Sequence, residues 1–158
     1  MSTAREVPSA TRWLTQDETA AWLPLLRVGQ LLPQAMDRQL RKEAGIRHAY
    51  YQVLVHLSAQ PDRTLSMGEL ARLAATSPSR LSHAVAAMEE RGWVTRRPCS
   101  TDRRVQYAGL TDAGLSLLER VAPGHVADVR RLVFDRLTED EVSQLRSLTL
   151  KLLPSLDA

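Results

Sequence analysis

The chain has 158 residues, of which 44% are hydrophobic and only 4% aromatic, and its formal net charge at pH 7 is +3. This length favours a single domain with a core built mostly from Leu, Val and Ala. No apolar run reaches the ~20 residues that span a bilayer, and the first residues lack the apolar core of a signal peptide, so we expect no membrane partner and a cytoplasmic location. Cys99 is the only cysteine, which excludes an internal disulfide and fits a reducing compartment.

Serine and threonine residues mark the starts of several predicted helices. Three of them are followed three positions later by Glu, the pattern of a capping box: Thr15, Ser66 and Thr138. Thr111 lacks this glutamate, but Leu110 and Leu115 flank it at the spacing of a hydrophobic staple. We therefore expect a helix to begin after each of these four positions.

The first predicted helix runs from about Gln16 to Glu43. Gly45 follows it and is a favourable C-terminal cap. Pro24 and Pro33 lie inside the segment, and because each removes a backbone donor, we expect a kink or an interruption there.

The middle of the chain has the order of a helix-turn-helix. Apolar residues at helical spacing predict three helices, from about Arg47 to Ser58, from Met67 to about Ala74, and from Pro78 to Gly92. Pro61–Thr64 is predicted to be a turn, and Ser77 caps the helix that starts at Pro78. A short helix, a tight turn and a second helix in this order predict a helix-turn-helix.

After Gly92 the pattern changes to that of a β-hairpin. We expect strands over Trp93–Arg97 and Arg104–Ala108, joined by a turn that begins at Pro98. A hairpin directly after a helix-turn-helix makes a winged helix. Two further helices, Asp112 to about Arg136 and Glu139 to about Leu153, complete a mainly α fold, an α+β winged helix with six helices and a small β-hairpin wing.

Positive charge is concentrated in the hairpin. Residues 91–104 contain five arginines and a single acid, Asp102, so their local charge is +4. Arg103 and Arg104 at the tip can reach a narrow DNA minor groove, where the negative potential is strongest. We expect Asp102, two residues away, to hold an arginine guanidinium in one orientation. The strand arginines, Arg96 and Arg97, are candidates for phosphate contacts.

The helix that starts at Pro78 has a polar face near its beginning. Four residues lie there, opposite the apolar side: Ser79, Arg80, Ser82 and His83. Arginine can fork onto a guanine, serine can bond to bases or phosphates, and the helix N-terminus, at Ser77, attracts a phosphate. The alternative for this face is an ordinary solvated surface, and for the hairpin a solvated loop whose arginines reflect genome composition.

We find a resemblance to the MarR family of transcriptional regulators in the pattern LSMGELARLAATSPSRLSHAVAAMEERGWVTRR, followed by TDRR and by LTDAG. The resemblance extends from about Gln16 to Leu153, and its most specific parts are the Asp102–Arg104 wing and the LTDAG helix start. It implies a domain over residues 16–153, with a DNA-binding winged helix at 61–110. Residues 16–45 and 111–153 would be helices that form a dimerisation region from both termini.

The resemblance also implies a homodimeric repressor that binds double-stranded DNA at a near-palindromic operator. Arg104 would enter the minor groove, Asp102 would orient it, and the helix from Pro78 would read the major groove. Two leucine-rich terminal helical segments are more than a small winged helix needs, so the sequence itself favours a partner surface. A winged helix that binds protein in place of DNA is the alternative function.

In many relatives a small aromatic or anionic effector weakens DNA binding, and the resemblance places it between the dimerisation helices and the winged helix. The candidates for that wall are Trp13, Trp22, His48, Tyr51 and His56, for which simple packing is the alternative. Cys99, beside Arg97, could be made oxidisable by nearby positive charge, which would give a redox-responsive regulator; a passive thiol is the alternative. The scattered histidines, with no phosphate loop or nucleophile motif, predict no metal, no cofactor and no catalysis.

Overall fold

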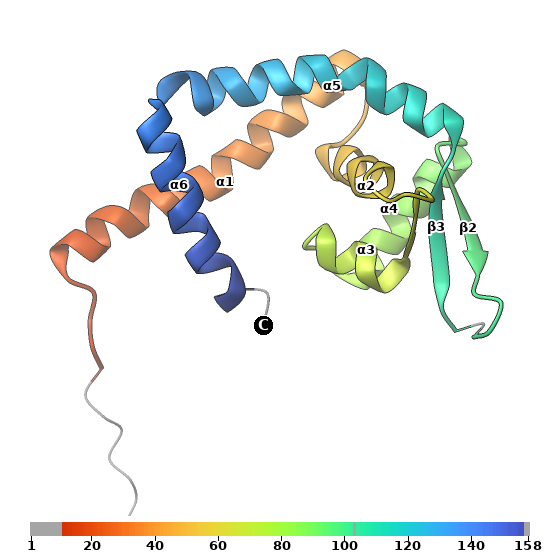
Figure 1. The fold of residues 1–158 in the computed structure, drawn as a ribbon, viewed down its shortest axis with the longest axis horizontal. Coiled ribbons are helices and arrows are strands. Elements are labelled where there is room, and N and C mark those ends of the chain that lie inside the picture. Colours follow the sequence, from red (N-terminus) through yellow and green to blue (C-terminus); the bar gives the residue numbers. More distant parts are fainter. Residues whose placement is uncertain (1–10, 103, 157–158) are drawn as a thin grey trace, which may run out of the picture.

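The computed structural model describes residues 11–102 and 104–156. The elements follow the chain in the order α1 (Gln16–Ala44), α2 (His48–Ser58), β1 (Thr64–Ser66), α3 (Met67–Leu73), α4 (Pro78–Glu90), β2 (Val94–Pro98), β3 (Gln106–Leu110), α5 (Asp112–Leu132), η1 (Phe134–Arg136), α6 (Glu139–Leu152) and η2 (Leu153–Ser155). Figure 1 shows α2–α4 and the strands gathered at one end, with α1 and α5 running away from them toward α6. The predicted mainly α winged-helix fold is confirmed.

The predicted helix starts are confirmed by their caps. Thr15 and Thr138 form reciprocal capping boxes with the glutamates three residues later. Ser66 accepts a hydrogen bond from the Glu69 N–H, while the Glu69 carboxylate binds Arg72. Each cap satisfies an otherwise unpaired donor in the first turn of its helix.

The first helix passes through both of its prolines without interruption. α1 is continuous from Gln16 to Ala44 with Pro24 and Pro33 inside it, so the predicted interruption is wrong. The carbonyls that lose their donors belong to Ala20 and Gly29, four residues earlier, and both residues are exposed, so water can bind them. Gly45 ends the helix in the left-handed conformation, φ 66°, as predicted.

The sheet has one strand more than the predicted hairpin. β1 pairs with β3 on the side opposite β2, giving the antiparallel order β1-β3-β2. β1 includes Thr64, which we predict from the sequence to lie in a turn. The prediction misses this strand because three residues are too few to show an alternation of apolar and polar side chains. β3 begins at Gln106 and not at Arg104, since the Val105 N–H donates to the Asp102 carbonyl in the turn before the strand.

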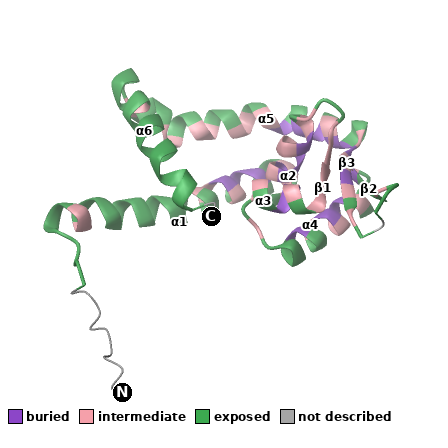
Figure 2. Cartoon of the chain, turned by 60° about the horizontal axis from the view of Figure 1, so that its bottom comes forward, coloured by how far each residue is buried: buried purple, intermediate pink, exposed green. Residues whose placement is uncertain are grey.

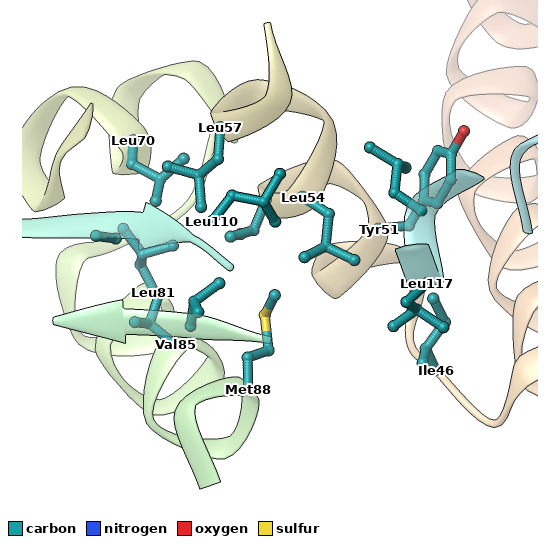
Figure 3. Packing of buried hydrophobic residues seen from close by; sticks show 14 of the residues in the cluster. Ile46, Tyr51, Leu54, Leu57, Leu70, Leu81, Val85, Met88, Leu110 and Leu117 are labelled. Carbon is teal, nitrogen blue, oxygen red and sulfur yellow. The ribbon is translucent and has the colours of Figure 1, made fainter. Parts of the chain in front are cut away.

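The core lies between α2, α3, α4 and the sheet, as the packed side chains in Figure 3 show. The predicted apolar face of α4 is confirmed, because Leu81, Val85 and Met88 are at most 1% exposed. Leu54 and Leu57 of α2 pack in the same cluster. The core therefore holds the apolar side of α4 and leaves its polar side free.

The last helices depart from prediction in one place. The helix expected to reach Arg136 ends at Leu132, and the short 3-10 helix η1 follows before α6 begins at Glu139. None of the described residues of α6 is buried within the chain (Figure 2). In the part of the chain that the structure describes, no helix has both the length and the apolar character needed to cross a bilayer.

The start of α5 packs directly on the end of α4. Thr111 accepts a hydrogen bond from the Gly114 N–H and donates to the carbonyl of Gly92 at 2.7 Å. A Cβ on Gly114 would collide with the Trp93 carbonyl oxygen and approach Leu110 Cδ1 to 2.7 Å. The glycine of LTDAG is thus required by a backbone contact and not by an unusual φ.

Gly114→Ala should lower the free energy of unfolding by about 1–3 kcal/mol, because the added methyl must displace the backbone of Trp93. Chemical denaturation monitored by circular dichroism measures the change. Gly68→Ala is the matched control, since nothing lies within 4 Å of its Cβ position. Equal stabilities for the two variants would contradict the close contact.

Candidate nucleic-acid interface

The polar face of α4, which the sequence predicts to contact DNA bases, is exposed to solvent. Its apolar residues point into the core, and its polar residues near the start are all exposed: Ser79, Arg80, Ser82 and His83. Ser77 caps this helix by accepting a hydrogen bond from the Arg80 N–H at 3.3 Å, and Pro78 occupies the first turn. The helix start therefore carries donors and acceptors that face away from the protein.

The tip of the wing is fixed through its backbone. The Asp102 carboxylate accepts a hydrogen bond from the Arg104 N–H at 2.9 Å, and the Cys99 N–H donates to the Val105 carbonyl at 2.8 Å. The sequence placed this carboxylate on a guanidinium; the described residues place it on the backbone, so Asp102 shapes the turn from which the exposed Arg104 side chain projects. Arg103 lies outside the described residues.

The strand arginines have partners within the chain. The Arg96 guanidinium donates to Glu89 Oε2 at 2.7 Å, and the Arg96 N–H donates to Glu89 Oε1 at 2.9 Å. The Arg96 side chain lowers the pKa of Glu89, and its backbone N–H adds to that effect. Arg97 lies over the ring of Tyr107, 5.8 Å from its centroid. Arg96 thus connects the wing to the end of α4, a contact that residue spacing does not predict.

A groove joins the helix and the wing into one surface. It measures about 510 Å³ and is lined by Pro78 and Ser82 of α4, by Arg96 and Arg104 of the wing, and by Gly68 of α3. Residues that the sequence predicted separately from a helix and from a hairpin therefore meet along one face. A polyanion lying in this groove would contact both elements at once.

The predicted effector-site residues lie in two separate places in one chain. Tyr51 is buried on α2, and the missed residue His125 of α5 packs on it, with 4.2 Å between ring centroids. His48 stacks on the same histidine at 5.7 Å. Trp13 is 83% exposed and precedes α1, and Trp22 is 48% exposed and lies in the first turns of α1. Figure 1 shows that this end of α1 is far from α2. His56 is half-buried on α2.

Burial accounts for the titration of this histidine pair. It lowers the pKa of His48, with a further contribution from the charge of His125, and it also lowers the pKa of His125, against a smaller opposing effect of Asp128. Burial raises the pKa of Tyr51. His125 Nδ1 is buried and has no hydrogen-bond partner among the described residues. Burial thus favours the neutral forms of both histidines, which pack with Tyr51 as an aromatic cluster.

Cys99 is a free, half-exposed thiol just after β2. Its pKa is lowered by a hydrogen bond with the Thr101 hydroxyl, 3.2 Å from Sγ, and by the N–H groups of Thr101 and Asp102. The Asp102 charge opposes the shift. The sequence attributed such a shift to nearby arginines, whereas hydrogen bonds in the turn cause it. Within residues 11–102 and 104–156, no three His, Cys, Asp or Glu side chains are grouped to hold a metal ion.

Fold and surface together define a winged helix-turn-helix protein with a basic wing. The family model described as MarR family matches residues 44–105. The chain is 44% identical to Sco3205, a MarR family transcriptional regulator from Streptomyces coelicolor solved in complex with DNA, with a TM-score of 0.88 over 98% of this chain and 94% of that one. The chain belongs to the MarR family of transcriptional regulators, a family without enzymatic activity.

Two further relatives support this assignment. AbsC, another MarR family regulator from Streptomyces coelicolor, is 37% identical, with a TM-score of 0.85 over 92% of this chain and 98% of that one. The transcriptional repressor MprA of Escherichia coli K12 is 29% identical over 119 residues, which cover 75% of this chain and 67% of MprA.

Asp102→Ala should speed amide hydrogen exchange at Arg104 by about threefold to tenfold, because it removes the acceptor of that N–H. Asp102→Asn keeps an acceptor oxygen and should remain close to wild type. Hydrogen exchange followed by NMR compares them. If Asp102→Asn loosened the turn as much as Asp102→Ala, the charge, and not the backbone bond, would hold the tip.

Proposed function

We propose that this transcriptional regulator is a homodimeric repressor that binds a near-palindromic operator through α4 and the wing, and that a small aromatic or anionic ligand releases it. The observation that carries the proposal is the groove in which Ser82 of α4 and Arg104 of the wing lie together. A continuous basic surface on the protein is suited to a DNA duplex, because the phosphates of the duplex follow one another along the edges of its major and minor grooves.

Each element has a distinct task on the duplex. α4 enters the major groove, where Arg80 reaches a guanine edge and the residues around it bond to bases or phosphates: Ser77, Ser79, Ser82 and His83. Arg104 and its neighbour Arg103 enter the minor groove beside the wing. Arg97 contacts phosphate, and Arg96, which is paired with Glu89, offers its remaining donors to a phosphate from a fixed position. The structure of Sco3205 in complex with DNA supports DNA as the partner of this surface.

The apolar surface at the far end of the molecule supports a dimer. α6 exposes four apolar side chains at 39–58%: Leu145, Leu148, Leu150 and Leu152. Leu145, Leu148 and Leu152 share one face of the helix. α1 exposes Leu23, Leu25 and Val28 in the same way (Figure 2). An apolar groove of about 490 Å³ runs between α1 and α5, lined by Val28, Leu31 and Leu132 among others. We propose that a second copy covers these surfaces, because exposed apolar area of this kind marks interaction sites.

Repression and ligand release are the finer parts of the proposal. The similarity to the repressor MprA supports repression. For the ligand, the junction of α1, α2 and α5 carries two of the candidates, His48 and Tyr51, while His56 lies further along α2. Because Trp13 and Trp22 lie at the other end of α1, a site that contains all five residues requires the second subunit.

Arg104→Ala should weaken binding to an operator selected from a random duplex pool by about 1–3 kcal/mol while the dimer stays intact. Gel-shift titration measures the affinity. Arg146→Ala, which removes the same charge from an exposed position on α6, should bind DNA as the wild type does. Unchanged affinity of Arg104→Ala would reject the role of the wing.

Removal of residues 138–158 should give unfolded or aggregated chains, because α1 and α5 would lose the surface that α6 offers across the dimer. Light scattering after size exclusion, together with circular dichroism, detects this outcome. A soluble, folded monomer would show that the terminal helices do not interlock.

A further inference from the structure

A second groove lies on the side of α4 away from the wing. It measures about 470 Å³ and separates α4 from the beginning of α2. Arg47 and Tyr50 line it from α2, Arg80 and His83 line it from α4, and Thr76 belongs to the turn before α4. The reading helix is therefore bordered on both sides by grooves that carry arginines, with Arg104 in one and Arg47 in the other.

This second groove is positively charged and unneutralised. The described residues that line it include no Asp or Glu, and neither Arg47 nor Arg80 forms an ion pair within the described part of the chain. The first turn of α2 also contains no acid. Arg41, only six positions earlier, differs because it pairs with Asp37 at 2.5 Å. The charges of the groove therefore remain available to an anion from outside the chain.

Arg47 has no evident task in folding. It is the N-cap residue of α2, but its side chain makes no capping bond and is exposed. Asp37 of α1 caps the helix instead, by accepting the His48 N–H at 2.9 Å. Burial opposes ionisation of Asp37, but the hydrogen bonds from His48 and Arg41 outweigh it and lower its pKa. The Arg47 guanidinium is thus free to reach across the groove.

The geometry of a duplex supplies an anion at this place. The major groove is about 12 Å wide, so a helix inside it has a phosphate backbone on either side. If α4 occupies the major groove, the wing and Arg104 meet one strand, and the groove that contains Arg47 faces the other. A guanidinium binds phosphate oxygens in a fork, and Tyr50 and Thr76 offer hydroxyl donors beside it.

We propose that Arg47 binds a backbone phosphate of the operator strand on the side of α4 opposite the wing. This inference rests on the proposed function, since it assumes that α4 lies in the major groove. The contact does not depend on the base sequence, because phosphates are the same at every base pair. It sets the depth and the register at which α4 lies in the major groove. The interface would thus contact the DNA backbone on both sides of α4, through Arg104 on one side and Arg47 on the other.

The test compares operator affinity over a series of KCl concentrations for full-length Arg47→Gln and wild type. We expect affinity at moderate salt to fall about tenfold. The slope of log K against log salt concentration should become shallower by about 0.9, the value for one phosphate. The preference for operator over scrambled duplex should not change. Arg47→Lys, which keeps the charge but not the fork, should restore the slope and part of the affinity.

Lys42→Gln is the matched control, because it removes one exposed positive charge from nearby α1 and should leave the slope unchanged. If Arg47→Gln kept the wild-type affinity and slope while Arg104→Ala bound more weakly, this inference would fail and the proposed function would stand. If no variant and no wild-type protein bound duplex, the proposed function itself would fail. If Arg47→Gln kept the wild-type slope, and if added benzoate released the wild type but not this variant from the operator, the groove would bind a small anion and the phosphate contact would be overturned.

Discussion

The orientation of α4 relative to the wing is the constraint on which the rest of the molecule depends. Two features set it: the ion pair of Glu89 with Arg96 at the surface, and the burial of Met88 of α4 in the same hydrophobic core as Val94 and Ala108 of the wing strands. An exposed ion pair contributes about 0.2–1 kcal/mol, whereas each large buried apolar side chain contributes about 1.5–3 kcal/mol. Packing therefore determines the angle, and the ion pair restricts the remaining movement of the strand. Because both elements share one core, a duplex meets a surface that is already assembled.

Local signals in the sequence predicted most of the fold. Capping residues, glycine at the end of α1 and the spacing of Leu81, Val85 and Met88 act within a few residues of one another, so they can be read without knowledge of the tertiary structure. β1 could not be read in this way, because three residues become a strand only when β3 lies beside them. The sequence alone does not show that α1 continues through its prolines, because their cost depends on whether water reaches the freed carbonyls, which is a tertiary property.

The sequence predicts which residues form the candidate interface, but not which other residues of the chain they contact. The exposed residues of α4 and the position of Arg104 follow from periodicity and the hairpin, and the structure places them along one groove. Three features are visible only in the folded chain: the ion pair of Glu89 with Arg96, the hydrogen bond from the Arg104 N–H to Asp102, and the groove that Arg47 and Arg80 line together. Each joins residues from separate elements or depends on the exact path of a turn. Sequence spacing alone does not fix such contacts.

The cap that α1 provides for α2 has a mechanical consequence. Asp37 lies on the helix whose apolar surface we assign to the dimer, and it holds the first N–H of the helix that begins beside Arg47. α2 also packs on α5, through the rings of His48 and Tyr51 against His125. A tilt of α1 between subunits must therefore either break this single hydrogen bond or carry the start of α2 along with it. In the proposed dimer, this one carboxylate would therefore couple the relative position of the two subunits to the distance between their α4 helices.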